Sequence, residues 1–182
     1  AGLGFTGALM SFASFNSFLP TLALESYGIS LGGSGLIAAL YVLPGGFSGI
    51  LVGYLLKGTE GRAPVLAVAG LVIAASFAGM TLTESYPVLL GLAVANGLAW
   101  GFFPILYMVP FHLEGIRPRE IAVAVAVVMS MASLGSSVGP TLTGYLQETQ
   151  GSLQVALRII SLSPLTLVVA ARLLHSGNQK KV

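Results

Sequence analysis

The sequence predicts an all-α polytopic membrane protein with six transmembrane helices, and three observations support this. Hydrophobic residues make up 55% of the 182 residues and charged residues only 8%, whereas a soluble domain carries charge on about a quarter of its residues. The charges stand singly or in short segments and leave long uncharged runs between them. A helix needs roughly 20 apolar residues to cross a hydrocarbon core of about 30 Å, and the runs reach that length. They show no strand-like alternation, so helices are favoured over a membrane barrel.

Each span is expected in a long run that is free of charge or nearly so, and together the spans form one bundle over residues 1–182. The expected helices cover residues 1–24, 32–56, 63–83, 86–111, 120–146 and 154–174. The sixth differs from the others because it contains Arg158 in its first turns and Arg172 near its end, from where long side chains can reach the headgroups. The chain begins with Ala1 and no basic leader precedes the first run, so we expect a part of a longer protein rather than a signal peptide.

Basic residues mark one side of the membrane. They lie in the loops after the second and fourth helices and at the end of the sixth, whereas the other loops carry acidic residues. The basic residues of this side are Lys57, Arg62, Arg117, Arg119, Arg172, Lys180 and Lys181. The loops of the other side carry Glu25, Glu84 and Glu148, with Arg158 as the only nearby cation. The positive-inside rule therefore predicts a multi-pass protein of the cell (inner) membrane with a cytoplasmic C-terminus.

Composition argues against several function classes. The net charge is +2, and the eight Lys and Arg residues are too scattered to follow a phosphate backbone, so no nucleic acid is expected as a partner. Cysteine is absent, which excludes thiolate metal sites and disulfides. His112 and His175 stand near helix ends without the spacing of a helical metal-ligand pair. We therefore expect no enzyme activity, no metal and no other cofactor.

Glycines at four-residue spacing predict close packing between helices. Small residues at this spacing let two membrane helices approach each other. The expected packing positions are Gly45 and Gly49, continuing to Gly53, in the second helix, Gly97 and Gly101 in the fourth, and Gly135, Gly139 and Pro140 in the fifth. Pro44, Pro104, Pro140 and Pro164 each remove a backbone hydrogen bond within a span, and permit a bend there.

The loop between the second and third helices carries the most informative motif. Residues 53–66 read GYLLKGTEGRAPVL. With six helices around it, this turn resembles the one in each half of a major facilitator superfamily (MFS) carrier, where the signature is approximately G-x-L-x-D-R-x-G-R-R. Gly53, Gly61 and Arg62 match, whereas Lys57 stands at the Asp position and Gly58 at the first Arg position. One extra residue precedes Gly61, and such erosion resembles the C-terminal half of the family.

This resemblance implies a fold, a function and partners. The chain would be one half of a twelve-helix MFS-type carrier, with the N-terminal half preceding Ala1. It would act as a secondary active transporter, a permease or an efflux carrier, which moves a small solute across the cytoplasmic membrane by alternating access. Its partners would be the lipid bilayer, the N-terminal half and the solute, with proton coupling left open. The expected cytoplasmic gate comprises Gly53, Lys57, Glu60, Gly61, Arg62, Arg117 and Arg119.

The candidate solute site follows from the helices that line the central cavity in this family, which are the first, second, fourth and fifth of each half. In the fourth helix, Asn96, Trp100, Phe103 and Tyr107 are spaced by four, three and four residues, so they are expected to share one face. A polar and aromatic stripe at the midplane could bind a ligand by stacking and a few hydrogen bonds. The other candidates are Asn16, Tyr41, Ser130, Ser133 and Ser137.

Two alternatives remain open at this point. A six-helix pore or channel is the first, although no selectivity-filter sequence is visible. The second, within the carrier interpretation, is a drug/proton antiporter rather than a nutrient or anion permease. The Gly139-Pro140 step resembles the fifth-helix motif of family antiporters, which would favour drug/proton exchange if the chain were the N-terminal half. No charged residue lies near the middle of a run, and an embedded proton relay would need one. A titrating group would therefore come from the other half, and neutral aromatic walls suit an uncharged or amphipathic solute.

Overall fold

The computed structural model describes residues 1–56, 61–112, 115 and 117–179, with side chains as far as Leu174. Among the predicted gate and tail residues, Lys57, Glu60, Lys180 and Lys181 lie outside this range. Six helical spans within it are long and apolar enough to cross a membrane, which confirms the predicted all-α polytopic fold. We call the end of the bundle that carries Arg62, Arg117 and Arg119 the basic end.

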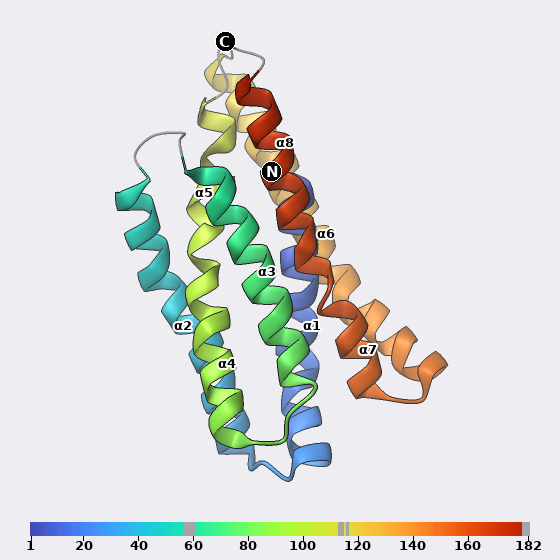
Figure 1. Cartoon of the computed structure of the whole chain (residues 1–182). Coiled ribbons are helices and arrows are strands. Elements are labelled where there is room, and N and C mark those ends of the chain that lie inside the picture. The colour runs from blue at the N-terminus through green and yellow to red at the C-terminus, as the bar shows by residue number, and fades with distance from the viewer. Residues whose placement is uncertain (57–60, 113–114, 116, 180–182) are drawn as a thin grey trace.

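The six spans are built from eight α-helices and three short 3-10 turns in the described residues (Figure 1). The first three spans are α1 (Gly2–Tyr27), α2 (Leu31–Leu55) and α3 (Arg62–Met80). The fourth comprises α4 (Tyr86–Ala99), η1 (Trp100–Phe102), α5 (Phe103–Met108) and η2 (Val109–His112). The fifth is α6 (Pro118–Gln150), and the sixth comprises α7 (Leu153–Ile160), η3 (Ser163–Leu165) and α8 (Thr166–Gln179).

Glycines, rather than charges, end two of the spans. α1 continues past Glu25 to Gly28, which has φ 63°, and α6 continues past Glu148 to Gly151, which has φ 68°. Glycine adopts this left-handed conformation without the steric penalty of a Cβ, so it commonly closes a helix. A charged residue at a membrane surface can remain helical, which is why bounds drawn at the charges are too short here.

Proline breaks two spans and leaves others continuous. Pro104 has no N–H to donate to the Trp100 carbonyl, and the N–H of Phe103 bonds that oxygen instead, so the chain tightens into η1. Pro164 lies within η3, which separates α7 from α8. Pro44 and Pro140 lie inside uninterrupted α-helices. The position of a proline therefore predicts a lost bond but not the local response.

The helices pack in pairs. α1 lies along α6, α2 along α4, and α3 between α4 and α8 (Figure 1). At the first crossing, a Cβ on Gly135 would meet the carbonyl oxygen of Thr6, and one on Gly139 would meet that of Met10. The glycines of α6 thus bring its backbone against the backbone of α1, as in other small-residue crossings.

The crossing of α2 with the fourth span also uses glycine. A Cβ on Gly97 would lie 2.6 Å from the carbonyl oxygen of Leu40, and one on Gly101 would lie 3.0 Å from the backbone of Ser48. The first distance is shorter than real Cβ contacts, and the second is tighter than most of them. At these two positions the glycines of the fourth span therefore pack directly against the backbone of α2.

The break in the sixth span fits between two further glycines. The carbonyl oxygen of Ser163 occupies the space of a Cβ on Gly7 of α1, and the carbonyl of Pro164 lies 2.9 Å from a Cβ built on Gly70 of α3. The Ser163 hydroxyl also donates to the Gly7 carbonyl at 2.7 Å. The irregular backbone of η3 is thereby held by two neighbouring helices.

The end of α3 away from the basic end is capped by side chains of other spans. Its last carbonyls lack partners within the helix. The Tyr27 hydroxyl donates to the Met80 carbonyl at 3.0 Å, while Gln154 Nε2 and Arg158 Nη2 donate to the Thr81 carbonyl at 2.6 and 3.2 Å. Arg158 therefore joins the first turns of the sixth span to α3, in addition to being exposed.

Coverage by the rest of the chain is uneven. In the most apolar stretch of α2 and of α6, only 11% of the residues are buried within the chain, compared with 39–44% in the other four spans. The exposed side chains of α2 include Leu43, Phe47 and Ile50, and those of α6 include Val127 and Leu134. Both helices thus present large apolar faces outward.

Candidate functional site

A cavity of about 600 Å³ opens between α1, α2 and the fourth span. Its lining is almost entirely apolar or aromatic, which is the usual character of a small-molecule site. The lining residues are Leu9 and Phe12 of α1, Tyr41, Val42, Gly45, Gly46, Gly49 and Ile50 of α2, and Trp100, Phe103 and Pro104 of the fourth span. The three predicted site residues Tyr41, Trp100 and Phe103 therefore meet at one cavity.

Aromatic rings meeting edge to face form its walls. The Phe12 ring lies 5.0 Å from that of Trp100 at 69°, and 5.9 Å from that of Tyr41 at 84°, measured between centroids. Such contacts contribute roughly 0.5–1.5 kcal/mol beyond burial. Trp100 is only 9% exposed, whereas Phe103 is 39% exposed at the rim. A ring-sized ligand would thus meet rigid aromatic surfaces.

Glycines on α2 leave the space that the cavity occupies. Gly45 is closely packed, because a Cβ there would lie 2.9 Å from that of Trp100. A Cβ on Gly49 would make only an ordinary contact with Pro104 at 3.7 Å, and one on Gly46 would meet nothing within 4 Å. Gly46 and Pro104 were not predicted as site residues, although the adjacent pair Gly45-Gly46 is a visible signal of missing side-chain volume.

Asn96 lies behind the cavity rather than in it. It is fully buried, and its Nδ2 donates to the Ser76 hydroxyl at 2.7 Å and, more weakly, to the Ile73 carbonyl at 3.4 Å. Its Oδ1 accepts a hydrogen bond from Trp100 Nε1 at 3.1 Å. Asn96 thus ties the Trp100 indole to α3, through the sequence-distant Ser76, which the sequence pattern did not single out.

The expected single-faced stripe of the fourth span is therefore split. A 3-10 turn adds about 20° of rotation per residue relative to an α-helix, and η1 lies between Asn96 and Phe103. Asn96 faces α3, and Phe103 faces the cavity. Tyr107 does not line the cavity but stacks on Phe103, with the ring centroids 6.4 Å apart.

Asn16 does not line the cavity, but it lies one helical turn beyond the lining residue Phe12 on α1. The Tyr41 hydroxyl donates to Asn16 Oδ1 at 3.0 Å, and Asn16 is exposed while Tyr41 is fully buried. Asn16 follows Phe12 by one helical turn, so both lie on one face of α1. The two predicted site residues Asn16 and Tyr41 are therefore brought together.

The serines of α6 occupy a separate surface. Ser130, Ser133 and Ser137 are exposed, and none of them lines the cavity. They lie on a different side of α6 from Gly135 and Gly139, which pack on α1. The structure thus leaves these hydroxyls on an outward face of the chain.

The predicted gate residues that the structure describes lie at the basic end. Arg62 Nη2 donates to His112 Nε2 at 3.2 Å, and His112 Nδ1 bonds the Met108 carbonyl at 2.8 Å. This pattern fits the tautomer in which Nδ1 carries the proton. The first turn of α6 is closed by the Arg117 N–H, which donates to Glu120 Oε2 at 2.9 Å. The pair formed by Arg62 and His112 therefore joins the start of α3 to the end of the fourth span.

The remaining gate residues make simpler local structure. Gly61 has φ 81° and precedes α3, a conformation that favours glycine. Gly53 is exposed in α2 with open space beside it, and Arg119 is exposed in the first turn of α6. Within the described residues, no cluster of His, Cys, Asp or Glu could hold a metal ion.

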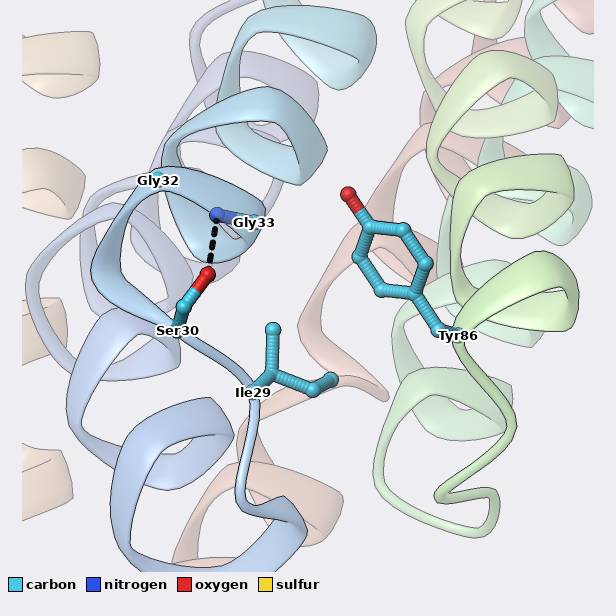
Figure 2. Close-up of a pocket in the computed structure, with 5 residues that line it drawn as sticks. All are labelled: Ile29, Ser30, Gly32, Gly33 and Tyr86. Atoms are coloured by element: carbon cyan, nitrogen blue, oxygen red, sulfur yellow. Dashed lines mark hydrogen bonds between the residues drawn. The ribbon is translucent and has the colours of Figure 1, made fainter.

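A second hollow, of about 430 Å³, lies at the end opposite the basic end. Figure 2 shows the Tyr86 ring reaching from the start of α4 toward the first turn of α2. There the Ser30 hydroxyl accepts a hydrogen bond from the Gly33 N–H at 3.2 Å and caps the helix (Figure 2). Since this polar contact already serves the helix end, the aromatic cavity is the stronger candidate site.

Comparison with known proteins agrees with this architecture. A family model described as Major Facilitator Superfamily matches residues 1–181. Monocarboxylate transporter 10 of Mus musculus is 28% identical over 104 residues, which is 56% of this chain and 20% of that protein. The match thus spans a small part of the relative's length. Because the family model covers nearly all of the present sequence, the chain belongs to the Major Facilitator Superfamily.

Proposed function

We propose that the chain is the C-terminal half of a secondary active transporter, which moves a small solute across the cytoplasmic membrane by alternating access. In this proposal the aromatic cavity contributes part of the solute site. Membership of the superfamily supports the mechanism, and the cavity shared by α1, α2 and the fourth span is the observation that carries the site.

The proposal includes a partner and an orientation. The N-terminal half would cover the outward apolar faces of α2 and α6, which the present chain leaves largely uncovered. The exposed serines of α6 would then face that half or the aqueous path between the halves. Arg62, Arg117 and Arg119 at the basic end support a cytoplasmic position for that end and for the C-terminus, and a gate there would use these side chains.

Two solute classes are considered in this proposal. The name of the mouse relative, a monocarboxylate transporter, supports a small organic acid. The alternative is drug/proton antiport, which rests on the Gly139-Pro140 step. In the structure, Gly139 serves packing against Met10, so this step has a role independent of proton exchange. The proposal therefore favours an organic solute with an apolar body, and assigns any proton-coupling group to the other half.

A substitution that fills the cavity tests this function. Gly46→Leu places a side chain in open space within the cavity, so it should reduce solute uptake by the full-length carrier at least tenfold while the protein still inserts. The matched control is Gly35→Leu, because Gly35 is also in α2 with nothing within 4 Å of a Cβ and does not line the cavity. Uptake by reconstituted vesicles is the measurement.

Three outcomes are distinguished. Loss of uptake in Gly46→Leu alone supports the site. Equal uptake by Gly46→Leu and Gly35→Leu overturns the proposal that the aromatic cavity is part of the solute site. Flux that does not saturate and shows no counterflow overturns the carrier mechanism in favour of a pore.

A further inference from the structure

We propose that the aromatic cavity receives a ligand with a flat apolar body and a hydrogen-bond acceptor, and that the Asn16 amide N–H₂ group binds this acceptor. The proposal rests on the proposed function, which it deepens by naming the chemistry of the solute. A carboxylate or a carbonyl oxygen would satisfy it.

The orientation of the Asn16 amide is the first step. Its Oδ1 accepts the hydrogen bond from the Tyr41 hydroxyl at 3.0 Å. An amide is planar, with the oxygen and the NH₂ group on opposite sides of the same carbon, so an oxygen directed at Tyr41 directs both N–H donors away from it. Among the described residues Asn16 Nδ2 has no partner, and Asn16 is exposed. Two oriented donors are therefore available.

The position of these donors is the second step. Tyr41 lines the cavity, and its hydroxyl is within hydrogen-bond distance of Asn16. Phe12, one turn earlier on the same face of α1, also lines the cavity. Asn16 does not itself line the cavity, but its amide stands beside the Tyr41 end of the aromatic wall, where a ligand head would project when its body lies against the Phe12 and Trp100 rings.

The polarity of the rest of the lining is the third step. The two lining side chains with polar hydrogens are Tyr41 and Trp100, and both hydrogens are already engaged, by Asn16 Oδ1 and by Asn96 Oδ1. A ligand acceptor buried against these walls would lose its water without replacement. The Asn16 donors remain for it, and they complement an acceptor rather than an ammonium group.

Two probes with one body and opposite heads test the proposal. Phenylpropionate carries an acceptor head and phenylpropylamine a donor head. Trp100 is the single tryptophan of the sequence, so binding is followed as the emission change of the protein minus that of its Trp100→Phe variant. We expect the ratio of the two affinities to favour phenylpropionate, and to fall about tenfold or more in Asn16→Leu, the size expected for a hydrogen bond to a charged acceptor.

The matched control is Tyr41→Phe. This variant removes the bond to Asn16 Oδ1 but keeps the ring and the amide donors, so it should retain most of the preference for phenylpropionate. An unchanged ratio in Asn16→Leu would overturn the proposal, and so would equal losses in Asn16→Leu and Tyr41→Phe, because the bond between the two residues would then be the cause. Binding of both probes with no preference overturns the inference but leaves the proposed function standing. Binding of neither probe overturns the cavity as the site of such a ligand, whereas the carrier mechanism itself fails only on the uptake and counterflow measurements.

Discussion

Two helix crossings in this molecule use the same glycine spacing for opposite purposes. In α6, Gly135 and Gly139 press against the carbonyls of Thr6 and Met10, so that the two backbones touch. In α2, Gly45 is packed, but space opens at Gly49 and Gly46, and the cavity lies there. Small residues four apart therefore reveal where side-chain volume is missing. Whether backbone or a ligand uses that volume depends on the neighbouring helix.

The largest expected effect comes from a substitution in the crossing of α1 and α6, where the two backbones touch. Gly135→Leu would place a side chain where the Thr6 carbonyl lies, and the backbones of α1 and α6 would have to separate. We expect a loss of several kcal/mol, above the roughly 1–3 kcal/mol of ordinary overpacking, and little monodisperse protein in size-exclusion chromatography. Gly144→Leu is the control, because a Cβ on Gly144 of the same helix meets nothing within 4 Å. Similar yields of the two variants would contradict the close contact.

The next effect concerns Asn96, which holds Trp100 at the wall of the cavity between α2 and the fourth span. Asn96→Leu should lower the free energy of unfolding by about 1–3 kcal/mol, because Trp100 Nε1 loses its acceptor in a buried site. Trp100→Phe has no donor to leave unpaired, so adding it to Asn96→Leu should cost less than the sum of the single changes. Thermal unfolding in detergent measures all three variants. Strict additivity would show that the two side chains are not coupled.

The smallest effect comes from adding a single methyl group to a glycine beside the cavity and to a glycine in the α1–α6 crossing. Gly46→Ala should raise stability by up to about 0.5–1 kcal/mol, because alanine favours a helix and its Cβ meets open space. Gly139→Ala should lower it, since its Cβ would meet the Met10 carbonyl. Melting temperatures of the pair should therefore shift in opposite directions. Shifts of the same sign would mean that the free space beside a glycine does not decide the effect of a methyl group there.

The sequence predicts the spans well because their cause is local. Uncharged runs of sufficient length must cross lipid as helices, and six such spans are present. The exact ends are less predictable, since Gly28 and Gly151 close α1 and α6 beyond the nearest charges. Those ends depend on backbone conformation, which a hydropathy pattern does not predict.

The candidate site is only partly predictable. Tyr41, Trp100 and Phe103 were expected and line one cavity, because aromatic residues at mid-span are unusual enough to notice. The direction of Asn96 was not foreseeable, since a helical pattern tells which residues share a face but not which neighbour that face meets. The η1 turn at Pro104 adds a further rotation that a uniform α-helix does not contain.

The broken sixth span has a consequence for how the sequence can vary. Its irregular turn fits because Gly7 on α1 and Gly70 on α3 each leave room for a backbone carbonyl of the turn. Three positions in three separate spans are therefore constrained as a unit. An alanine would also meet a side chain of α8, Thr166 at Gly7 and Leu167 at Gly70. A homologue that replaces Pro164 and restores a regular helix should therefore accept alanine at the two sites only where these α8 side chains move together with the backbone.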